Sequence, residues 1–201
     1  WTTGHTAYES VMQAHVELLP NSSSALSELS RVYAMSHFSF AVYYKLPQKI
    51  AMDAADWGWN LVGFSALREL SPGGLSRLFA EEGKDSVALY QNEETLQCVL
   101  AFEGTNLDDS SDWISDADAM PKNFCGIASV HEGFRNKLLR TVLSNDYQDV
   151  IKTRLPRCDG VLVTGHSLGG AQAALFAACA NRQRSPDARF AAGSEGHYGA
   201  I

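Results

Sequence analysis

The spacing of apolar residues predicts an early helix. Between residues 25 and 44, apolar positions recur mostly at the intervals of one helix face. These positions are Leu26, Leu29, Val32, Tyr33, Phe40 and Tyr44. The aromatic content of the segment is compatible with lipid contact, but we favour a helix that packs under a sheet. Pro47 should end this helix, because proline cannot continue the backbone hydrogen bonding.

Apolar runs of strand length follow later in the chain. Residues 86–90 and 96–102 predict two strands, with a turn at 91–94 between them. Residues 161–164 predict a further buried strand. We therefore expect a sheet built from the middle of the chain.

Helical spacing is found between and before these strands. It is clearest at 134–143 and 147–155, with a break near 144–146, and weaker at 61–70 and 75–82. A strand, then helices, then a strand and another helix is the order of a right-handed βαβ unit with parallel strands. The pattern thus predicts an α/β fold.

A G-x-S-x-G motif follows the strand predicted at 161–164. Its residues are Gly165, His166, Ser167, Leu168 and Gly169, with Gly170 next. A run of small and apolar residues then continues to 180 as a predicted helix. A strand, a sharp turn and a helix form the context of a nucleophile elbow, which holds a serine above the sheet. The alternative, a plain strand-to-helix turn, is less favoured by these flanking patterns.

The chemistry of such an elbow assigns a role to each residue type. A serine hydroxyl is a weak nucleophile and needs exposure and a neighbouring base. Side chains at Gly165 and Gly169 would collide in so tight a turn. The backbone N–H of Leu168, at the start of the helix, is the first candidate donor to an oxyanion. We therefore predict Ser167 as the nucleophile.

The elbow and three upstream segments together resemble the class 3 (fungal-type) lipases. The segments are VLAFEGT at 99–105, DWISD at 112–116 and VHEGF at 130–134, and the resemblance covers roughly residues 86–201. It implies an α/β-hydrolase with a mostly parallel central sheet flanked by helices, and hydrolysis of lipid esters. Glu103 departs from the family, which usually has arginine there. No role for an arginine is therefore carried over to this position.

Thr105 is predicted as the second oxyanion donor. It leaves the strand at 96–102 at a carboxyl end of the sheet, the edge where open α/β sheets bind ligands. The family match implies the same role, and a simple turn threonine is the alternative. The resemblance also implies a lid helix within the polar segment 106–124, although an ordinary surface helix is equally compatible with this sequence.

Length, composition and charge limit the number of domains and the kinds of partner that we expect. A chain of 201 residues with 45% hydrophobic content fits a single domain, 1–201, with a poorly defined segment at 1–24. The net charge of −7 argues against nucleic acid as a partner. No apolar run has the length of a transmembrane segment. The chain begins with Trp1 and shows no signal-peptide pattern, so we expect a processed or partial chain.

Neither metal binding nor a cofactor is expected. Five aspartates follow Thr105 but lack the spacing of a calcium loop: Asp108, Asp109, Asp112, Asp116 and Asp118. The cysteines show no metal-like pairing. Cys98 and Cys179 fall in a predicted strand and helix and are expected as core thiols, whereas Cys125 and Cys158 fall in loops and could pair. Secreted and organellar locations both stay open, and so does the oligomeric state.

The catalytic acid and base are not evident in the sequence. In this fold an acid and a histidine follow the serine. The candidates downstream of Ser167 are Asp187, Glu195 and His197. Asp187 precedes the next predicted strand, and the other two are too close together to approach the serine from separate loops. We therefore expect the chain to stop before the acid and base, with the fold incomplete at its C-terminal end.

The sequence thus predicts a serine carboxylic-ester hydrolase that acts on lipid esters through an acyl-enzyme. The expected partner is a lipid ester substrate, for which an oil–water or membrane interface is one possible setting. One alternative is a feruloyl esterase or phospholipase on the same fold. The other is a hydrolase-fold binding module without turnover.

Overall fold

The computed structural model describes residues 23–44, 46–67, 84–104, 121–182 and 198–200. The chain divides into two compact units, Trp1–Ala34 and Met35–Ile201. The described part of the first unit is the beginning of helix α2 (Ser23–Ala41). The sheet, the helices that cover it and the turn after β6 lie within the second unit. The expected single domain over 1–201 and the segment 1–24 stay predictions.

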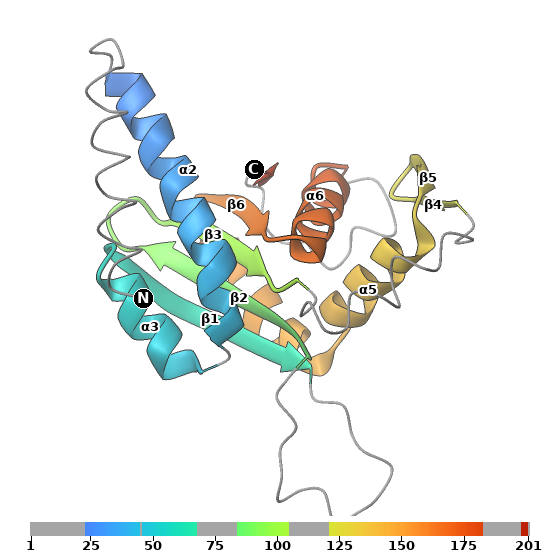
Figure 1. Ribbon diagram of the computed structural model, residues 1–201, viewed down its shortest axis with the longest axis horizontal. Coiled ribbons are helices and arrows are strands. Elements are labelled where there is room, and N and C mark those ends of the chain that lie inside the picture. Colours follow the sequence, from blue (N-terminus) through green and yellow to red (C-terminus); the bar gives the residue numbers. More distant parts are fainter. Residues whose placement is uncertain (1–22, 45, 68–83, 105–120, 183–197, 201) are drawn as a thin grey trace, which may run out of the picture. The chain divides into compact units, whose positions relative to one another are not determined.

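Five of the described strands form a sheet at the centre of the second unit (Figure 1). Its strands, in spatial order, are β1 (Trp59–Leu67), β2 (Lys84–Asn92), β3 (Gln97–Phe102), β6 (Gly160–Gly165) and β7 (Tyr198–Ala200). β1, β2 and β3 are antiparallel neighbours, whereas β3, β6 and β7 run parallel. This sheet is therefore mixed, with its parallel half next to the predicted elbow.

The two strands predicted at 86–90 and 96–102 are confirmed as β2 and β3, and that predicted at 161–164 is confirmed as β6. The helix expected at 61–70 is wrong, because β1 occupies residues 59–67 and pairs with β2 along its length. Short apolar runs fit a buried strand or a helix equally well by spacing, and pairing with a neighbouring strand decides between them. The helix expected at 75–82 and the strand expected after Asp187 lie outside the described residues, apart from 198–200.

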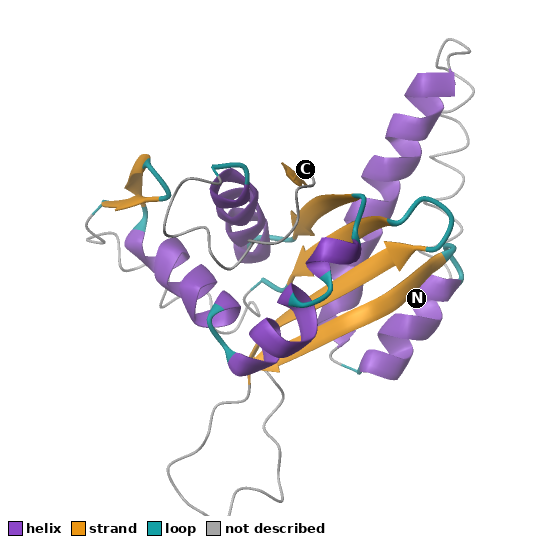
Figure 2. Cartoon of the chain, turned by 180° about the vertical axis from the view of Figure 1, so that it is seen from behind, coloured by secondary structure: helices purple, strands orange, loops and turns teal. Residues whose placement is uncertain are grey.

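Helices cover both faces of the sheet (Figures 1 and 2). The end of α2 and α3 (Pro47–Ala55) lie on one face, and α5 (Glu132–Val142) and α6 (Leu168–Ala180) on the other. The π-helix η4 (Tyr147–Lys152) and the 3-10 helix η5 (Leu155–Arg157) follow α5, and a small hairpin, β4 (Lys122–Phe124) and β5 (Ile127–Val130), precedes it. The helical segments predicted at 134–143 and 147–155 are thus confirmed.

The helix predicted over 25–44 is confirmed, but the role expected of Pro47 is wrong. α2 ends at Ala41 and the 3-10 helix η1 (Val42–Tyr44) follows it directly. Pro47 is the first residue of α3 instead of a terminator. Proline is well suited to a first helical position, where its missing N–H would have no partner within the helix.

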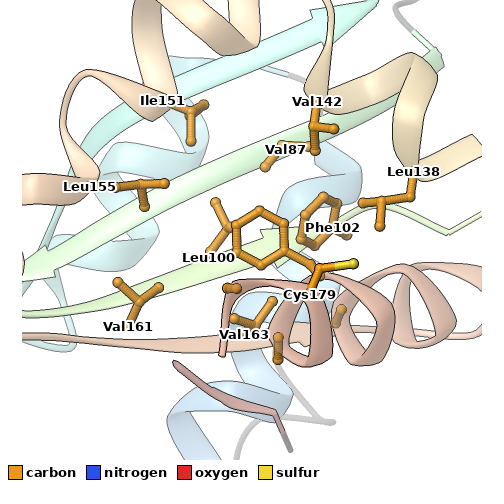
Figure 3. Packing of buried hydrophobic residues seen from close by; sticks show 14 of the residues in the cluster. Val87, Leu100, Phe102, Leu138, Val142, Ile151, Leu155, Val161, Val163 and Cys179 are labelled. Atoms are coloured by element: carbon orange, nitrogen blue, oxygen red, sulfur yellow. The ribbon is translucent and has the colours of Figure 1, made fainter. Parts of the chain in front are cut away.

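Side chains alternate between the two faces along each strand. On the face under α5 and α6, aliphatic residues and Phe102 form a continuous core (Figure 3). We call this the aliphatic face; its strand residues are Val87, Leu89, Cys98, Leu100, Phe102, Val161 and Val163. The opposite, aromatic face is formed by Ala88, Tyr90, Val99, Ala101 and Thr164 with Phe38 of α2. The Phe38 and Tyr90 rings stack with centroids 4.1 Å apart.

Both cysteine expectations need correction. The structure contains disulfides Cys98–Cys158 and Cys125–Cys179. Cys98 and Cys179 are fully buried, as expected of core positions, but they are not free thiols. Each predicted core cysteine pairs with a predicted loop cysteine, because the fold brings a loop onto the adjacent strand or helix. This proximity joins residues 60 and 54 positions apart and is not visible in the sequence.

The two disulfides brace different places. Cys98–Cys158 joins the beginning of β3 to the segment before β6, where Gln97 pairs with Gly160. Cys125–Cys179 joins the β4–β5 turn to the end of α6, and Arg182 donates to the Gly126 carbonyl of the same turn at 2.7 Å. Neither lies at the carboxyl ends of β3 and β6.

Candidate active site

Ser167 lies in a strained turn between β6 and α6. Its backbone has φ 57° and ψ −123°, outside the regions that residues with side chains normally occupy. The turn closes through hydrogen bonds from Gly169 N–H to the His166 carbonyl and from Gly170 N–H to the Ser167 carbonyl, both at 3.0 Å. Ser167 itself is solvent-exposed. A strained backbone that presents an exposed hydroxyl is the geometry of a nucleophile elbow.

Two glycines let the turn approach β3. A Cβ atom on Gly165 would meet the backbone of Gly169, and one on Gly169 would lie 3.0 Å from Glu103 C and Gly104 N. Backbone atoms cannot move aside as a flexible side chain can. The elbow and the exit of β3 therefore pack against each other through bare backbone.

The exits of β3 and β6 lie at the same edge of the sheet. Phe102 and Gly165 are Cα partners in the parallel ladder. Leu168 is the first residue of α6, and α-helices leave their first N–H groups without internal partners. Thr105, three residues after Phe102, lies outside the described residues.

Glu103, the residue where the family usually has arginine, is buried with an exposed fraction of 2%. Its Oε2 accepts a hydrogen bond from Ser86 N–H at 2.9 Å, and its backbone N–H donates to the Ser86 carbonyl. Its carbonyl accepts from Gln172 of α6. Glu103 therefore fastens the end of β3 to β2 and α6.

Tyr43 of η1 contacts both strand exits. Its hydroxyl accepts a hydrogen bond from Gly104 N–H at 3.1 Å and lies 3.3 Å from Nδ1 of His166. The His166 ring also packs against Phe40, with centroids 4.7 Å apart. Burial raises the pKa of the Tyr43 phenol, and the Glu103 carboxylate adds to this rise, whereas the Gly104 hydrogen bond opposes it. The phenol therefore keeps its proton at neutral pH.

Sequence reasoning missed Tyr43 as a site residue. Its place in an apolar helical segment predicted only packing under the sheet. A contact between residues 43 and 166 depends on how η1 is placed against the sheet, and no local sequence signal marks it. His166, in turn, was predicted only as an elbow residue.

The other described histidines are engaged elsewhere. His131 caps α5, where its Nδ1 accepts from Gly133 N–H at 3.1 Å. His37 of α2 pairs with Asp53 of α3 at 2.7 Å and packs against Trp57. The in-chain candidates for the acid and base, Asp187, Glu195 and His197, lie outside the described residues.

The sequence was expected to contain no metal site and no transmembrane segment. This expectation covers the whole chain, of which the structure describes the residues given above. Among these residues no cluster of histidine, cysteine or carboxylate side chains could hold a metal ion. The five aspartates between 108 and 118 lie outside that range, and so does most of the segment in which a lid was expected. In the described part of the chain, no helix is both long and apolar enough to cross a bilayer.

Comparison with known structures finds the same fold in several lipases. A lipase from Rhizopus microsporus var. chinensis is 22% identical with a TM-score of 0.53, and the match covers 83% of this chain and 54% of that one. Lipase II from Rhizopus niveus is 23% identical with a TM-score of 0.53, covering 83% and 59%. M37 lipase gives a TM-score of 0.55 at 18% identity, covering 83% and 56%. The chain therefore spans less than two thirds of these neighbours' length.

These structural matches establish the fold as that of an α/β-hydrolase. Residues 99–194 also match the family model described as lipase (class 3). This segment contains the exit of β3, the elbow and α6. Over this segment the chain is similar to the class 3 lipases. A search of curated protein sequences gave no match.

Proposed function

We propose that the protein is a serine carboxylic-ester hydrolase that acts on lipid esters through an acyl-enzyme, as a triacylglycerol lipase does. The observation that carries this proposal is the strained, exposed Ser167 between β6 and α6. The class 3 lipase match and the structural likeness to the Rhizopus lipases support the choice of lipid esters.

In this proposal Ser167 attacks the ester carbonyl and forms the acyl-enzyme. The developing oxyanion is stabilised by backbone N–H groups of Leu168 and Thr105. The register of β3 and β6 supports this choice of donors. Phe102 and Gly165 are Cα partners, and Thr105 and Leu168 each come three residues later in the sequence. Leu168 contributes as the first residue of α6, where the helix N-terminus favours negative charge.

The acid and the histidine that activate Ser167 are assigned to segments outside the described residues. His37 and His131 have other partners, and His166 adjoins the serine, where neighbouring side chains diverge. We expect the acid to precede the histidine in the chain, as the hydrolase fold requires. No metal or cofactor takes part in such a mechanism.

The proposed substrate is a lipid ester at an oil–water or membrane interface. Phe40, which packs on His166 next to the nucleophile, has an exposed fraction of 54%. An exposed ring at this place suits an acyl chain. We also propose an oxidising compartment, which two disulfides favour.

Hydrolysis of p-nitrophenyl esters by the natural protein tests the proposal. Activity should rise from acetate to longer acyl chains and should fall at least about a thousandfold in Ser167→Ala, since the acyl-enzyme can no longer form. Ser129→Ala is the matched control, because Ser129 is also exposed and also has a positive φ, 61°, but lies in β5. A preference for feruloyl or phospholipid esters would favour the alternative esterases. Absence of turnover on all esters would favour a binding module.

A further inference from the structure

We propose that Tyr43 is a positioning residue for the oxyanion hole, which it serves by tying the exit of β3 to the elbow. This inference rests on the proposed function for its catalytic consequence. Its structural content is a hydrogen-bonded bridge from Gly104 through the Tyr43 hydroxyl to His166. Tyr43 touches no reacting atom in this proposal.

The bridge fills the space between two backbone segments. A Cβ atom on Gly104 would collide with both the Tyr43 hydroxyl and the His166 carbonyl. The β3 exit is therefore enclosed by η1 on one side and the elbow on the other. Gly104 immediately precedes Thr105 in the sequence. A hydrogen bond that holds the Gly104 N–H should therefore also restrain the backbone that leads to the proposed second donor.

The protons of the bridge can be assigned from its donors and acceptors. A phenol has one proton and can also accept. Gly104 N–H donates to the Tyr43 oxygen, which leaves the O–H free to donate to Nδ1 of His166. Nδ1 must then carry no proton, so neutral His166 has its proton on Nε2. The tilted packing of Phe40 against the ring helps to keep this orientation.

The catalytic consequence follows from the geometry that an oxyanion hole needs. Its donors act when they lie about 2.7–3.1 Å from the developing oxyanion, and loss of one donor costs on the order of 10²–10³ in kcat. Loosening the residue before a donor should cost less than removing the donor. We therefore expect about a tenfold loss when the bridge is cut.

Tyr43→Phe cuts the bridge and keeps the ring. We expect kcat for ester hydrolysis to fall about tenfold with little change in KM, because the interaction matters mainly in the transition state. The matched control is Tyr44→Phe on the same turn, since Tyr44 packs under Lys49 and, in the described part of the chain, shows no contact with His166. Unchanged kcat in Tyr43→Phe, or an equal loss in Tyr44→Phe, would overturn the inference.

A second measurement separates this inference from the proposed function. Long-range ¹H–¹⁵N NMR spectra of the His166 ring should show the Nε2–H tautomer in the wild type and a mixture in Tyr43→Phe. A wild-type ring protonated at Nδ1, or no change in the variant, would overturn the bridge whatever the activity. An inactive wild type with the expected tautomers would instead overturn the proposed function, and with it the catalytic consequence, while the bridge would stand.

Discussion

One face of the sheet is filled by aliphatic side chains, whereas the other carries aromatic rings, a buried hydroxyl and the contacts that reach the elbow. On the aliphatic face, Leu100 and Val163 pack beneath α5 and α6 (Figure 3). On the aromatic face, Tyr90 stacks on Phe38, and Thr164 Oγ1 donates to the Met35 carbonyl at 3.2 Å. Residues just beyond Phe38 on the same segment, Phe40 and Tyr43, contact His166.

The difference indicates how stability and activity are divided between the two faces. Aliphatic packing stabilises the fold by burying apolar surface, and a cavity in it lowers the free energy of unfolding. Because this stabilisation has no preferred direction, it does not fix the position of an individual atom. Rings and hydroxyls have directional contacts, so they can set the position of a neighbouring backbone. We therefore expect changes on the aliphatic face to alter mainly the free energy of unfolding, and changes near Tyr43 to alter mainly turnover.

The largest loss of stability is expected from Leu100→Ala. Leu100 is fully buried in the aliphatic core, so the change leaves a cavity and should lower the free energy of unfolding by about 2–5 kcal/mol. Denaturant titration measures this loss. Val99→Ala is the control on the aromatic face of the same strand, and it should cost less because fewer methyl groups are removed. An equal cost for the two variants would contradict the importance assigned to the aliphatic core.

Removing the disulfide between the hairpin and α6 should have the next largest effect. The double substitution Cys125→Ser and Cys179→Ser should lower the free energy of unfolding by about 2–4 kcal/mol, chiefly by releasing a constraint on the unfolded chain. Thermal unfolding measures the change. The matched double variant at Cys98 and Cys158, which releases a loop of similar length, should lose a similar amount. A variant with wild-type stability would show that this bridge contributes nothing.

Gly169→Ala should lower both the free energy of unfolding and the turnover number, because Gly169 packs against the backbone at the end of β3 and lies two residues after Ser167. The added methyl group would press on the backbone of Phe102 and Glu103, at a cost of about 1–3 kcal/mol. Ester hydrolysis should fall with it. Gly58→Ala is the control: its φ of 75° is strained for alanine, but no atom lies within 4 Å of the added group. That variant should lose stability and keep its turnover number.

The smallest effect, and a stabilising one, is expected from Tyr90→Phe. The Tyr90 hydroxyl is buried and has no hydrogen-bond partner among the described residues, so its removal should raise the free energy of unfolding by up to about 1 kcal/mol. Chemical denaturation at neutral pH measures this gain. A destabilised Tyr90→Phe variant would reveal a partner of this hydroxyl.

The same tyrosine gives a pH dependence. Burial raises the pKa of Tyr90 far above that of a free tyrosine, and the nearby Asp53 carboxylate adds to the rise. The unfolded phenol ionises above about pH 10, while the folded one keeps its proton, so stability should fall as the pH rises beyond about 10. Tm between about pH 8 and pH 11 should therefore decrease less in Tyr90→Phe than in the wild type.

Sequence reasoning recovered the features that depend on local chemistry. The elbow could be predicted because glycine spacing and the flanking strand and helix are local, and β2, β3 and β6 followed from their apolar runs. The helix expected at 61–70 failed because strand pairing with β2 overrode an ambiguous spacing. Cysteine pairing and the Tyr43 bridge depend on contacts between distant segments, which spacing along the chain does not encode.

The proposed function depends on Ser167 being an activated nucleophile. A fluorophosphonate probe on the natural protein, followed by peptide mass spectrometry, tests this dependence, because the probe reacts with a serine only where a base and an oxyanion hole activate it. We predict labelling at Ser167, its loss in Ser167→Ala, and no labelling of the exposed Ser129. A protein that hydrolyses esters but carries the label on another serine, or a folded protein that takes up no label, would contradict the account.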